Sequence, residues 1–447
     1  MTINIPELGK PRIVIVGGGF GGIELAKALR RADVQIVLLD KHNYHTFQPL
    51  LYQVATAGLE PDSIAFPLRK IFKNQGNLQF RMAEVTRIVP EKQSIQTNIG
   101  SLRYDYLVLA TGSKTNCFGI ESIEQNAMPM KSVPEALDLR SLILQHLETA
   151  LETDDLKERE SLMNIVVVGG GPTGVEMAGA LGELKKHVLP ADYPDLDLRQ
   201  MNIHLIESGD ALLGVMSPIS GQKAHEFLKK FGVNVWLDTF VTHYDGNTVT
   251  FKDGRTLSAK TLIWAAGVMA DTVSGLAADS LARGQRIITD EFSRVKGYDH
   301  IFAIGDVAAM TSEKTPKGLP MLAPVAMQQG QLLAKNLQAL LNGKPMRAFT
   351  YFDKGTMATV GRNRAVVESM GIKTQGFMAW FMWMAVHLMT LVGFRNKLVT
   401  LVNWTWSYFN YDRGIRLIIR PYYPNYMPNP DILPQAPQTT ATIPAKV

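Results

Sequence analysis

The pattern of apolar and small residues that opens the chain occurs a second time near its middle. Arg12–Val16 is a short β-branched apolar run, followed at once by the glycine turn GGGFGG and a stretch with helical periodicity, IELAKALRRA. The same order returns at Asn164–Val168, which leads into GGGPTGVEMAGAL. A buried strand, a glycine turn and a helix in this order are typical of a parallel sheet covered by helices. We therefore predict an α/β fold with two Rossmann-like domains in three layers.

Both turns have the spacing G-x-G-x-x-G, in which glycine permits a tight turn and lets the backbone approach a pyrophosphate at the helix N-terminus. The strand after each turn ends in an acid, Asp40 in the first half and Glu207 in the second. A carboxylate at that place accepts hydrogen bonds from ribose hydroxyls. The sequence thus predicts two dinucleotide sites, with the fingerprint glycines Gly17, Gly19, Gly22, Gly169, Gly171 and Gly174.

The second acid also indicates which nicotinamide nucleotide binds. Glu207 comes late, after the loop KKHVLPADYPDLDLRQ, which we interpret as an insertion. Its carboxylate should bond the free ribose hydroxyls of NADH and repel the 2′-phosphate of NADPH, with no basic residue nearby to accommodate that phosphate. NADH is the predicted donor.

The amino-acid composition indicates a globular protein and excludes several kinds of cysteine-based site. The 447 residues are 46% hydrophobic, enough for two or three domains with buried cores. Cys117 is the only cysteine, which excludes an intrachain disulfide, a CxxC pair and a cysteine-based metal cluster, and we predict no metal site. The chain runs almost at once into its first strand without a secretory segment, so we expect the bulk of it to stay in the cytoplasm.

Three further segments strengthen the two-nucleotide interpretation. In order they are YDYLVLATG, TLIWAAG and IFAIGDVAA. With the two fingerprints they resemble the pyridine-nucleotide disulfide oxidoreductase superfamily, which has a glutathione-reductase-like fold. The resemblance implies FAD in the first domain and the nicotinamide nucleotide in a second domain inserted in the first. Further site residues implied by it are Thr111, Gly112, Gly305 and Asp306 for FAD, and Ala266 and Gly267 for NADH.

The region after the first acid distinguishes among members of the superfamily. It reads KHNYHTFQPLLYQVATAGLEP and lacks the cysteine pair of the disulfide reductases. Together with GGGPTGVE and the apolar C-terminal tail it resembles type II NADH dehydrogenases. That resemblance implies hydride transfer from NADH C4 to flavin N5, and then electron transfer to a membrane quinone without proton pumping. It also implies that Glu176 lies close to where the nicotinamide meets the flavin, as an NADH-binding and catalytic residue. Its alternative role is a first-turn carboxylate favoured by the helix dipole.

The family's quinone motif, AQxAxQ, is only partly present. The chain has APVAMQ, in which Pro324 replaces the first glutamine. Proline fits the first turn of the helix expected after Leu322, but one amide that would contact the quinone is missing. The quinone residues implied by the resemblance are Ala323, Ala326, Gln328 and Gln329, with Gln328 also counted as catalytic.

The C-terminal part combines apolar and basic residues. Residues 376–394 carry no formal charge, and a turn, GFRNK, separates their last residues from a second apolar stretch. Between residues 373 and 420 six basic residues stand against one aspartate, which favours a membrane surface as the partner over nucleic acid. We predict a hairpin of interfacial helices on the cytoplasmic face of the inner membrane. A single transmembrane helix over 376–394 and burial in a homodimer are the alternatives.

The remaining segments complete the predicted organisation. A helix with a capping box of Ser132 and Glu135 should link the two domains, and the acidic run ETDDLKERES after it is expected to be a solvated connection. The predicted domains are 11–115 with 285–350 for FAD, 116–160 for the linker helix, 161–284 for NADH, 351–420 for membrane association, and 421–447 as a disordered tail. Two alternative functions remain open, an NADH reductase of a soluble ferredoxin or rubredoxin, and an NADH-sensing flavoprotein with slow turnover.

Overall fold

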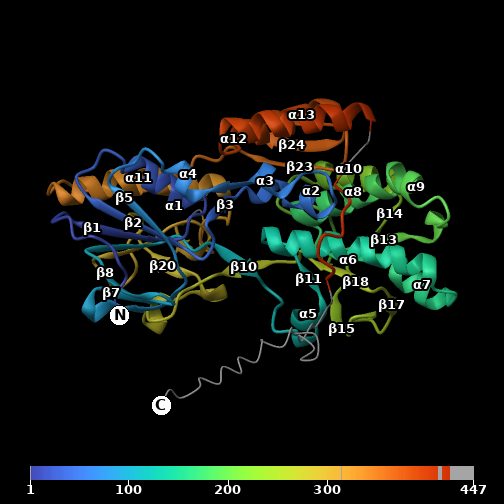
Figure 1. Cartoon of the computed structure of the whole chain (residues 1–447), viewed down its shortest axis with the longest axis horizontal. Helices are drawn as coiled ribbons and strands as arrows, with labels where there is room; N and C mark the ends of the chain where they lie inside the picture. Colours follow the sequence, from blue (N-terminus) through green and yellow to red (C-terminus); the bar gives the residue numbers. More distant parts are fainter. Residues whose placement is uncertain (1, 314, 411–414, 423–447) are drawn as a thin grey trace, which may run out of the picture.

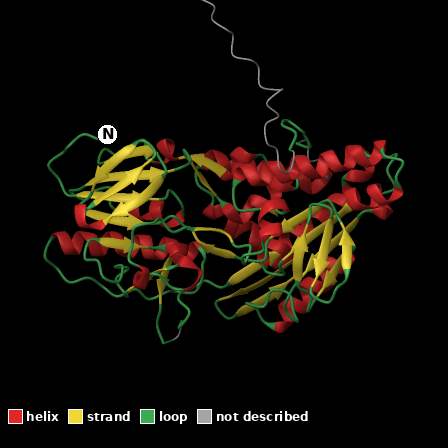
Figure 2. Cartoon of the chain, turned by 90° about the horizontal axis from the view of Figure 1, so that it is seen from below, coloured by secondary structure: helices red, strands yellow, loops and turns green. Residues whose placement is uncertain are grey.

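Two five-stranded parallel sheets form the two halves of the molecule. The computed structural model describes residues 2–313, 315–410 and 415–422. The first sheet has the order β21-β9-β1-β2-β5 and the second the order β11-β18-β12-β13-β14, with every pairing parallel. In Figure 1 the first sheet lies on the left and the second on the right, and Figure 2 shows their strands as separate groups. The strands are β1 (Arg12–Val16), β2 (Gln35–Asp40), β5 (Leu78–Met82), β9 (Tyr106–Leu109), β21 (Ile301–Ala303), β11 (Met128–Pro129), β12 (Asn164–Val168), β13 (Asn202–Ile206), β14 (Val233–Trp236) and β18 (Thr261–Trp264).

The chain leaves the first sheet, builds the second and then returns. It crosses to the second half along β10 (Ser113–Thr115) and comes back along β19 (Val268–Ala270), and these two strands pair antiparallel. The returning chain supplies β21, which pairs with β9. The predicted α/β fold, with one dinucleotide-binding unit inserted in the other, is confirmed.

Helices cover both sheets. In the first half α1 (Phe20–Ala28) packs on α11 (Ala323–Leu341), and in the second half α8 (Pro172–His187) packs on α10 (Pro218–Lys230). The strands β1 and β12 are buried along their whole length, as expected for strands covered on both faces. Both glycine turns therefore emerge from the centre of a sheet.

The linker helix is present with the predicted cap. Helix α6 (Val133–Glu152) begins after Ser132, whose Oγ accepts from the Glu135 N–H at 3.4 Å, while Glu135 Oε2 accepts from the Ser132 N–H at 2.8 Å. The acidic run that follows is largely exposed, but it differs from a simple connection because residues 156–163 form α7 (Leu156–Met163).

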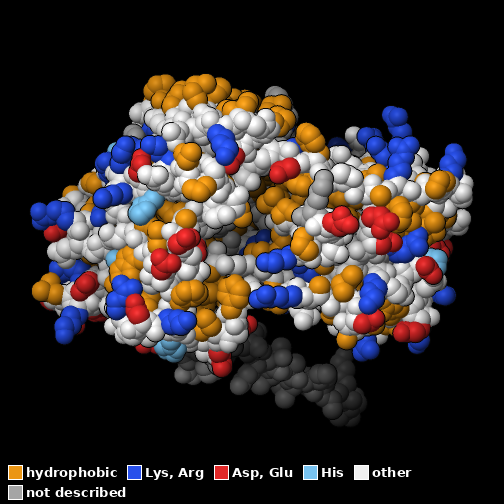
Figure 3. Space-filling model, turned by 180° about the vertical axis from the view of Figure 1, so that it is seen from behind, with side chains coloured by type: hydrophobic (Ala, Val, Ile, Leu, Met, Phe, Trp, Pro, Cys, Tyr) orange, Lys and Arg blue, Asp and Glu red, His pale blue; other side chains and the backbone are white. Residues whose placement is uncertain are grey.

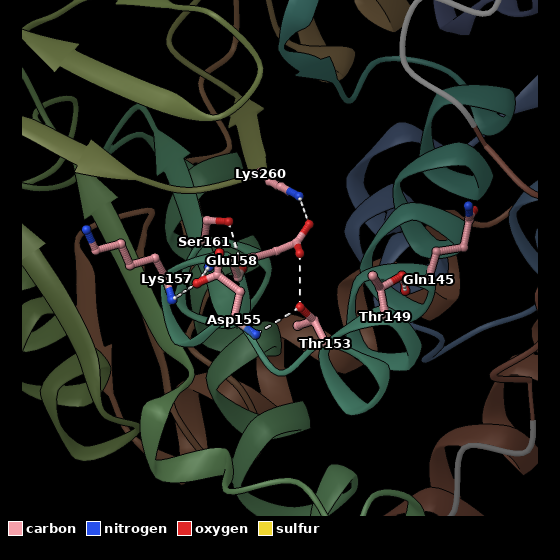
Figure 4. Close-up of polar contacts among 8 residues, drawn as sticks. All are labelled: Gln145, Thr149, Thr153, Asp155, Lys157, Glu158, Ser161 and Lys260. Atoms are coloured by element: carbon pink, nitrogen blue, oxygen red, sulfur yellow. Dashed lines mark hydrogen bonds and ion pairs between the residues drawn. The ribbon is translucent and has the colours of Figure 1, made fainter.

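Helix α7 is ordered by its own polar residues. Asp155 caps its N-terminus by accepting from the Lys157 N–H at 2.9 Å, and Glu158 pairs with Lys260 of the second half at 2.8 Å (Figure 4). A side-chain cap and an ion pair with the second half hold this polar helix in place. Its low hydrophobicity does not indicate such a fixed position.

The C-terminal region is a small sheet followed by a helical hairpin. Strands β23 (Thr356–Thr359), β24 (Ala365–Ser369) and β25 (Ile372–Gln375) pair antiparallel, and α12 (Phe377–Thr390) and α13 (Phe394–Asn410) follow. In Figure 1 these two helices lie along the top of the molecule, above both halves. The predicted pair of helices is confirmed, and among the residues that the structure describes there is no helix long and apolar enough to cross a bilayer.

Polar contacts fix α13 to the first half of the molecule. Asn396 Nδ2 donates to the backbone oxygens of Asp62 at 2.9 Å and Ser63 at 3.3 Å. Further along the helix Asn403 Nδ2 donates to Glu60 Oε2 at 2.7 Å. Because Asn396 is buried, these bonds satisfy an amide that would otherwise be costly to bury.

The other end of α13 is fixed to the second half by one arginine. Arg362 donates to the backbone oxygens of Tyr408 at 2.7 Å and Ser407 at 2.6 Å, at the C-terminus of the helix. The same guanidinium pairs with Glu183 of α8 at 3.5 Å, and both side chains are less than one tenth exposed. The hairpin is thus joined to both halves of the molecule.

The last described residues run along α6 in the same manner. Gln145 Nε2 donates to the Tyr422 carbonyl at 3.0 Å, and the Tyr422 N–H donates to Gln145 Oε1 at 2.7 Å. Arg420 pairs with Asp138 at 2.6 Å. The remainder of the predicted disordered tail, from residue 423, lies outside the described residues.

Replacing Arg362 and Arg420 in turn should show that the buried ion pair contributes more to stability than the exposed one. Arg362→Ala leaves Glu183 buried without its cation and removes the bonds to α13, so the free energy of unfolding should fall by about 3 kcal/mol. Arg420→Ala breaks a pair whose arginine is 75% exposed and should cost less than about 1 kcal/mol. Chemical denaturation of the two variants measures both values. Equal losses would mean that the Glu183 pair does not fix the hairpin.

Candidate functional site

The first glycine turn is a cradle that admits no side chains at two positions. Gly17 has φ +110°, and a Cβ there would run into the carbonyl of Ala110, at the end of β9. A Cβ at Gly22 would run into the carbonyl of Gly17. At Gly19 the space is open, since nothing lies within 4 Å of where its Cβ would be. The turn therefore leaves room for a ligand at the N-terminus of α1.

The second glycine turn repeats this geometry. Gly169 has φ +114°, and its Cβ would lie 2.5 Å from the carbonyl oxygen of Ala265, at the end of β18. A Cβ at Gly174 would run into the carbonyl of Gly169, and the space at Gly171 is open. The predicted residue Ala266 thus lies directly against the second fingerprint.

The acids at the strand ends also match each other. Asp40 accepts from the N–H of the middle glycine, Gly18, at 2.6 Å and from the His42 N–H at 2.7 Å. Glu207 accepts from the Gly170 N–H at 2.5 Å and from the Gly209 N–H at 2.7 Å. In both halves the carboxylate holds the turn in place and keeps lone pairs for further donors.

Burial affects the first of these acids. It raises the pKa of Asp40, although the N–H groups of His42 and Gly18 favour the carboxylate and oppose that shift. Two N–H donors, one in the glycine turn before α1 and one just after β2, therefore stabilise a partly buried charge beside the turn.

The residues predicted for the rest of the FAD site gather at the same end of the first sheet. Asp306 accepts from Ser113 Oγ at 2.6 Å, which joins the turn after β21 to the turn after β9. The buried hydroxyl of Thr111 has no hydrogen-bond partner among the described residues. An orphaned buried hydroxyl beside an open glycine cradle fits a polar ligand such as FAD.

Glu176 lies between the second half and the hairpin. It is buried in α8, and its Oε1 accepts from the Thr359 N–H of β23 at 3.4 Å. Burial raises its pKa to about 8, and the Thr359 N–H and the Trp383 side chain of α12 oppose the shift. Trp383 in turn stacks on His387 with ring centroids 4.1 Å apart. Glu176 is therefore a protonated carboxyl group at neutral pH.

The predicted quinone residues take backbone partners. Gln328 Nε2 donates to the Phe352 carbonyl at 2.9 Å, and its Oε1 accepts from the Phe352 N–H at 3.0 Å. Gln329 is buried, and its Oε1 accepts from the Gly305 N–H at 2.7 Å, so it supports the turn that carries Asp306. Ala323 and Ala326 lie in the first turn of α11. The side-chain amides of Gln328 and Gln329 thus form hydrogen bonds to the protein's own backbone.

A cavity lies beside these residues, between α1, α11 and the turn of the hairpin. Its volume is about 310 Å³. The lining residues are Phe20, Ile23, Glu24, Lys27, His45, Met327, Thr390, Leu391, Val392, Gly393 and Lys397.

The cavity reaches from the hairpin to the first glycine turn. Phe20 is part of GGGFGG and packs edge-on against His45 at 4.9 Å, and His45 Nδ1 bonds the Gly18 carbonyl at 3.1 Å. Burial lowers the pKa of His45 to about 4, so the ring is neutral at pH 7 and donates this bond. A wall of both apolar and polar side chains therefore connects the exposed hairpin with the predicted FAD site.

Sequence reasoning missed the hairpin side of this cavity. Met327 was inside the quinone motif but was not selected, Val392 was considered only as part of the apolar run 376–394, and Gly393 only as the start of the turn. The available signal was the break between two apolar runs, which marks a turn but not what the turn packs against.

Comparisons with protein families cover nearly the whole described chain. A family model described as pyridine nucleotide-disulphide oxidoreductase matches residues 11–330. A second model, described as NDH2 C-terminal domain, matches residues 354–410, which include β23 to α13.

Individual relatives give the same result. A type II NADH:quinone oxidoreductase of Mycobacterium tuberculosis is 37% identical over 422 residues, which are 90% of this chain and 89% of that protein. A type II NADH:quinone oxidoreductase of Haemophilus influenzae is 31% identical and covers 84% of this chain and 92% of its own length.

Solved structures share the fold. NDH2 from Plasmodium falciparum, in complex with NADH, has a TM-score of 0.83 at 22% identity and covers 92% of this chain and 100% of its own. The sulfide:quinone oxidoreductase of Aquifex aeolicus has a TM-score of 0.70 at 22% identity, covering 87% and 92%. At this identity the likeness concerns the architecture.

The buried carboxyl group of Glu176 should make stability depend on pH. Its pKa is raised from the ordinary 4.5 to about 8, so the folded protein binds this proton more tightly than the unfolded chain does. The stabilisation is complete below pH 4.5, declines as pH rises, and is lost above about pH 8. The loss should be on the order of 3 to 5 kcal/mol.

Chemical denaturation between pH 5 and 8.5 measures this dependence. Glu176→Gln, which cannot ionise, should remove the part of the slope that belongs to this group. If wild type and Glu176→Gln show the same slope, Glu176 is ionised in the folded protein and the raised pKa is wrong.

Proposed function

Because the chain belongs to the pyridine nucleotide-disulphide oxidoreductase family and, within it, to the type II NADH:quinone oxidoreductases, we propose that its first half binds FAD and its second half binds NADH. It is an NADH:quinone oxidoreductase. FAD, when bound, accepts a hydride from NADH and delivers the electrons to a quinone, which we propose occurs without proton pumping. The duplicated glycine cradle is the observation that carries this assignment.

The first cradle supplies the FAD site. Gly17, Gly19 and Gly22 give the pyrophosphate a turn without side chains, and Asp40 offers lone pairs to the adenosine ribose. The unpartnered hydroxyl of Thr111 supports a polar ligand next to that turn. The other residues that we assign to FAD are Gly112, Gly305 and Asp306.

The second cradle supplies the NADH site, through Gly169, Gly171 and Gly174. Glu207 lies beside the open cradle with a carboxylate that suits free ribose hydroxyls and disfavours a phosphate. The residues after it are Ser-Gly-Asp, so no cation follows the acid in sequence. Ala266 and Gly267 complete the site on the other side of the fingerprint.

Glu176 is suited to hold or exchange a proton. A carboxyl group with a pKa near 8 is protonated at neutral pH and can release its proton with little cost. Its position between α8 and α12 places that proton between the NADH-binding half and the hairpin. We assign it a catalytic role in this sense.

The cavity is the best-supported quinone site. It joins the turn of the hairpin to Phe20 and His45, and its lining combines apolar side chains, which suit a quinone ring, with polar and charged ones. The motif residues Ala323, Ala326, Gln328 and Gln329 belong to the same helix as Met327. Because both glutamines have backbone partners, we propose that the two glutamines shape the cavity wall instead of binding the quinone.

The hairpin is suited to a membrane surface. Its outward side chains include Phe381, Met389 and Phe409, which are 57%, 70% and 75% exposed. Figure 3 shows the hydrophobic side chains gathered along the top of the molecule, where α12 and α13 lie. An exposed patch of this kind marks an interaction site, and we propose that it enters the lipid interface on the cytoplasmic face, where the NADH pool is found. A homodimer through the same face is the competing arrangement.

Removing the second acid should change nucleotide preference. Glu207→Ala deletes an acceptor for the ribose hydroxyls and a negative charge near the 2′ position, so KM for NADH should rise about tenfold and discrimination against NADPH should weaken. Steady-state kinetics with the two nucleotides measures both effects. Asp253→Ala removes an exposed acid of the same half and should leave both values unchanged. Unaltered selectivity in Glu207→Ala would contradict the assignment.

Filling the cavity should block only the quinone step. In Val392→Trp the larger side chain occupies the mouth of the cavity, so reoxidation of the flavin by a short-chain quinone should slow by about tenfold or more, about 1.4 kcal/mol in the barrier. Bleaching of the flavin by NADH should keep its rate. Stopped-flow absorbance separates the two steps, and Leu401→Trp, on the exposed side of α13, is the matched control.

The same preparations test the membrane surface. Phe381→Glu places a charge in the apolar face and should reduce cosedimentation with anionic vesicles while leaving NADH bleaching intact. Val392→Trp should still cosediment with the vesicles.

For the cavity, the contrary outcome is a Val392→Trp variant whose flavin is reoxidised at the wild-type rate. The quinone would then reach the flavin by another route.

A further inference from the structure

One exposed aromatic residue lies at the second nucleotide cradle in an unusual backbone conformation. Phe118 is 62% exposed and has φ +54°. A bulky residue with positive φ is rare, and such strain tends to be retained at ligand sites. Neither the fold nor the proposed function has so far required this residue.

Hydrogen bonds to the end of β18 fix the backbone of the loop around Phe118. The Phe118 N–H donates to Asn116 Oδ1 at 2.9 Å, and the Asn116 N–H donates to the Gly267 carbonyl at 3.1 Å. Trp264 Nε1 donates to the Asn116 carbonyl at 2.8 Å. These bonds tie the loop to the end of β18, so its backbone is fixed while the aromatic ring projects outward.

The ring of Phe118 lies at the rim of the cradle. A Cβ at Gly267 would be 2.8 Å from Phe118 Cζ, so the ring packs directly over the glycine that ends the TLIWAAG segment. The neighbouring Ala266 is equally close to the fingerprint, because its Cα is 2.7 Å from where a Cβ of Gly169 would be. Phe118, Gly267, Ala266 and Gly169 therefore form one continuous surface.

Among the residues that the structure describes, the ring of Phe118 is paired with one other aromatic ring. This is Trp264, with ring centroids 6.5 Å apart in an edge-on arrangement. A hydrophobic ring that is mostly exposed gains stability only when a ligand or partner covers it.

The order of the strands indicates which part of the nucleotide would cover it. Glu207 directly follows β13, on one side of the fingerprint strand β12, and Phe118 is tied to β18 on the other side. A dinucleotide lies across the strand ends with its adenosine ribose at the acid. The nicotinamide riboside therefore extends toward β18, which is also the side where β10 arrives from the FAD-binding half.

We propose that the ring of Phe118 is a wall of the nicotinamide-riboside pocket and packs against NADH when it binds. This inference rests on the proposed function, and it assigns a binding residue that the nucleotide motifs do not contain. The fixed loop presents the ring in advance, so little conformational freedom is lost on binding.

Substitution of Phe118 should weaken nucleotide binding selectively. Phe118→Ala should raise the Kd of NAD+ for the oxidised holoenzyme, followed by flavin absorbance, and the half-saturating NADH concentration for flavin bleaching, each by about three- to tenfold. Phe118→Tyr keeps the ring and should retain wild-type values. Reoxidation of the reduced flavin by a short-chain quinone should be unchanged in both variants.

Two further variants keep the result interpretable. Phe118→Gly accepts a positive φ without strain and should show the same weakened binding as Phe118→Ala, because both lack the ring. Leu156→Ala removes a similarly exposed apolar side chain from α7 and should bind NAD+ as the wild type does.

The outcomes distinguish this inference from the function on which it rests. If Phe118→Ala and Phe118→Gly bind NAD+ and NADH like the wild type, the ring does not contact the nucleotide and the inference is overturned, while the NADH:quinone assignment stands. If the wild-type holoenzyme is not bleached by NADH at all, the proposed function fails instead.

Discussion

The close approach of the backbone to itself at each glycine turn is the constraint on which the molecule depends. Gly17 and Gly169 adopt positive φ with no room for a Cβ, and this brings the strand, the helix and the neighbouring turn into contact. The acid at the end of the next strand then holds the middle glycine through its N–H. The same two features place a helix N-terminus, with its unpaired N–H groups, at the edge of each sheet. The position of each proposed nucleotide site therefore follows from the close backbone contacts within its glycine turn.

Helix α8 connects the second of these turns with the hairpin. Its first turn belongs to the cradle, its second turn carries Glu176 against β23 and α12, and Glu183 near its end pairs with the arginine that caps α13. Helix α8 thus extends from the proposed NADH site to the hairpin proposed to bind the membrane. The hairpin is joined to the first half as well, through Asn396 and Asn403, so it is a packed part of the enzyme and its geometry is tied to both sites.

The sequence predicted those features whose cause is local. The glycine spacing, the acids at strand ends and the capping box of Ser132 each act within one or two elements, and the structure contains all three. The cavity could not be found in this way, because Phe20, Met327 and Val392 come from three distant segments that only tertiary packing brings together. The partners of Gln328 were hidden for the same reason, since a motif does not state whether an amide faces a ligand or the backbone of Phe352. The helix α7 was missed because a cap and an ion pair, and not an apolar face, hold it in place.

The near identity of the two cradles also has a consequence for how the protein acquires its nucleotides. In the proposed assignment each cradle binds a pyrophosphate through its glycine turn and an adenosine ribose through its acid, and FAD and NADH are alike in that half of their structure. The cradles alone thus offer little discrimination during assembly. Discrimination between FAD and NADH is then expected from the opposite ends of the two molecules, near Thr111 and Asp306 in the proposed FAD site and near Gly267 in the proposed NADH site. On this assignment, NADH would compete with FAD for the first cradle of a newly made chain, because that cradle contacts only the part that the two molecules share.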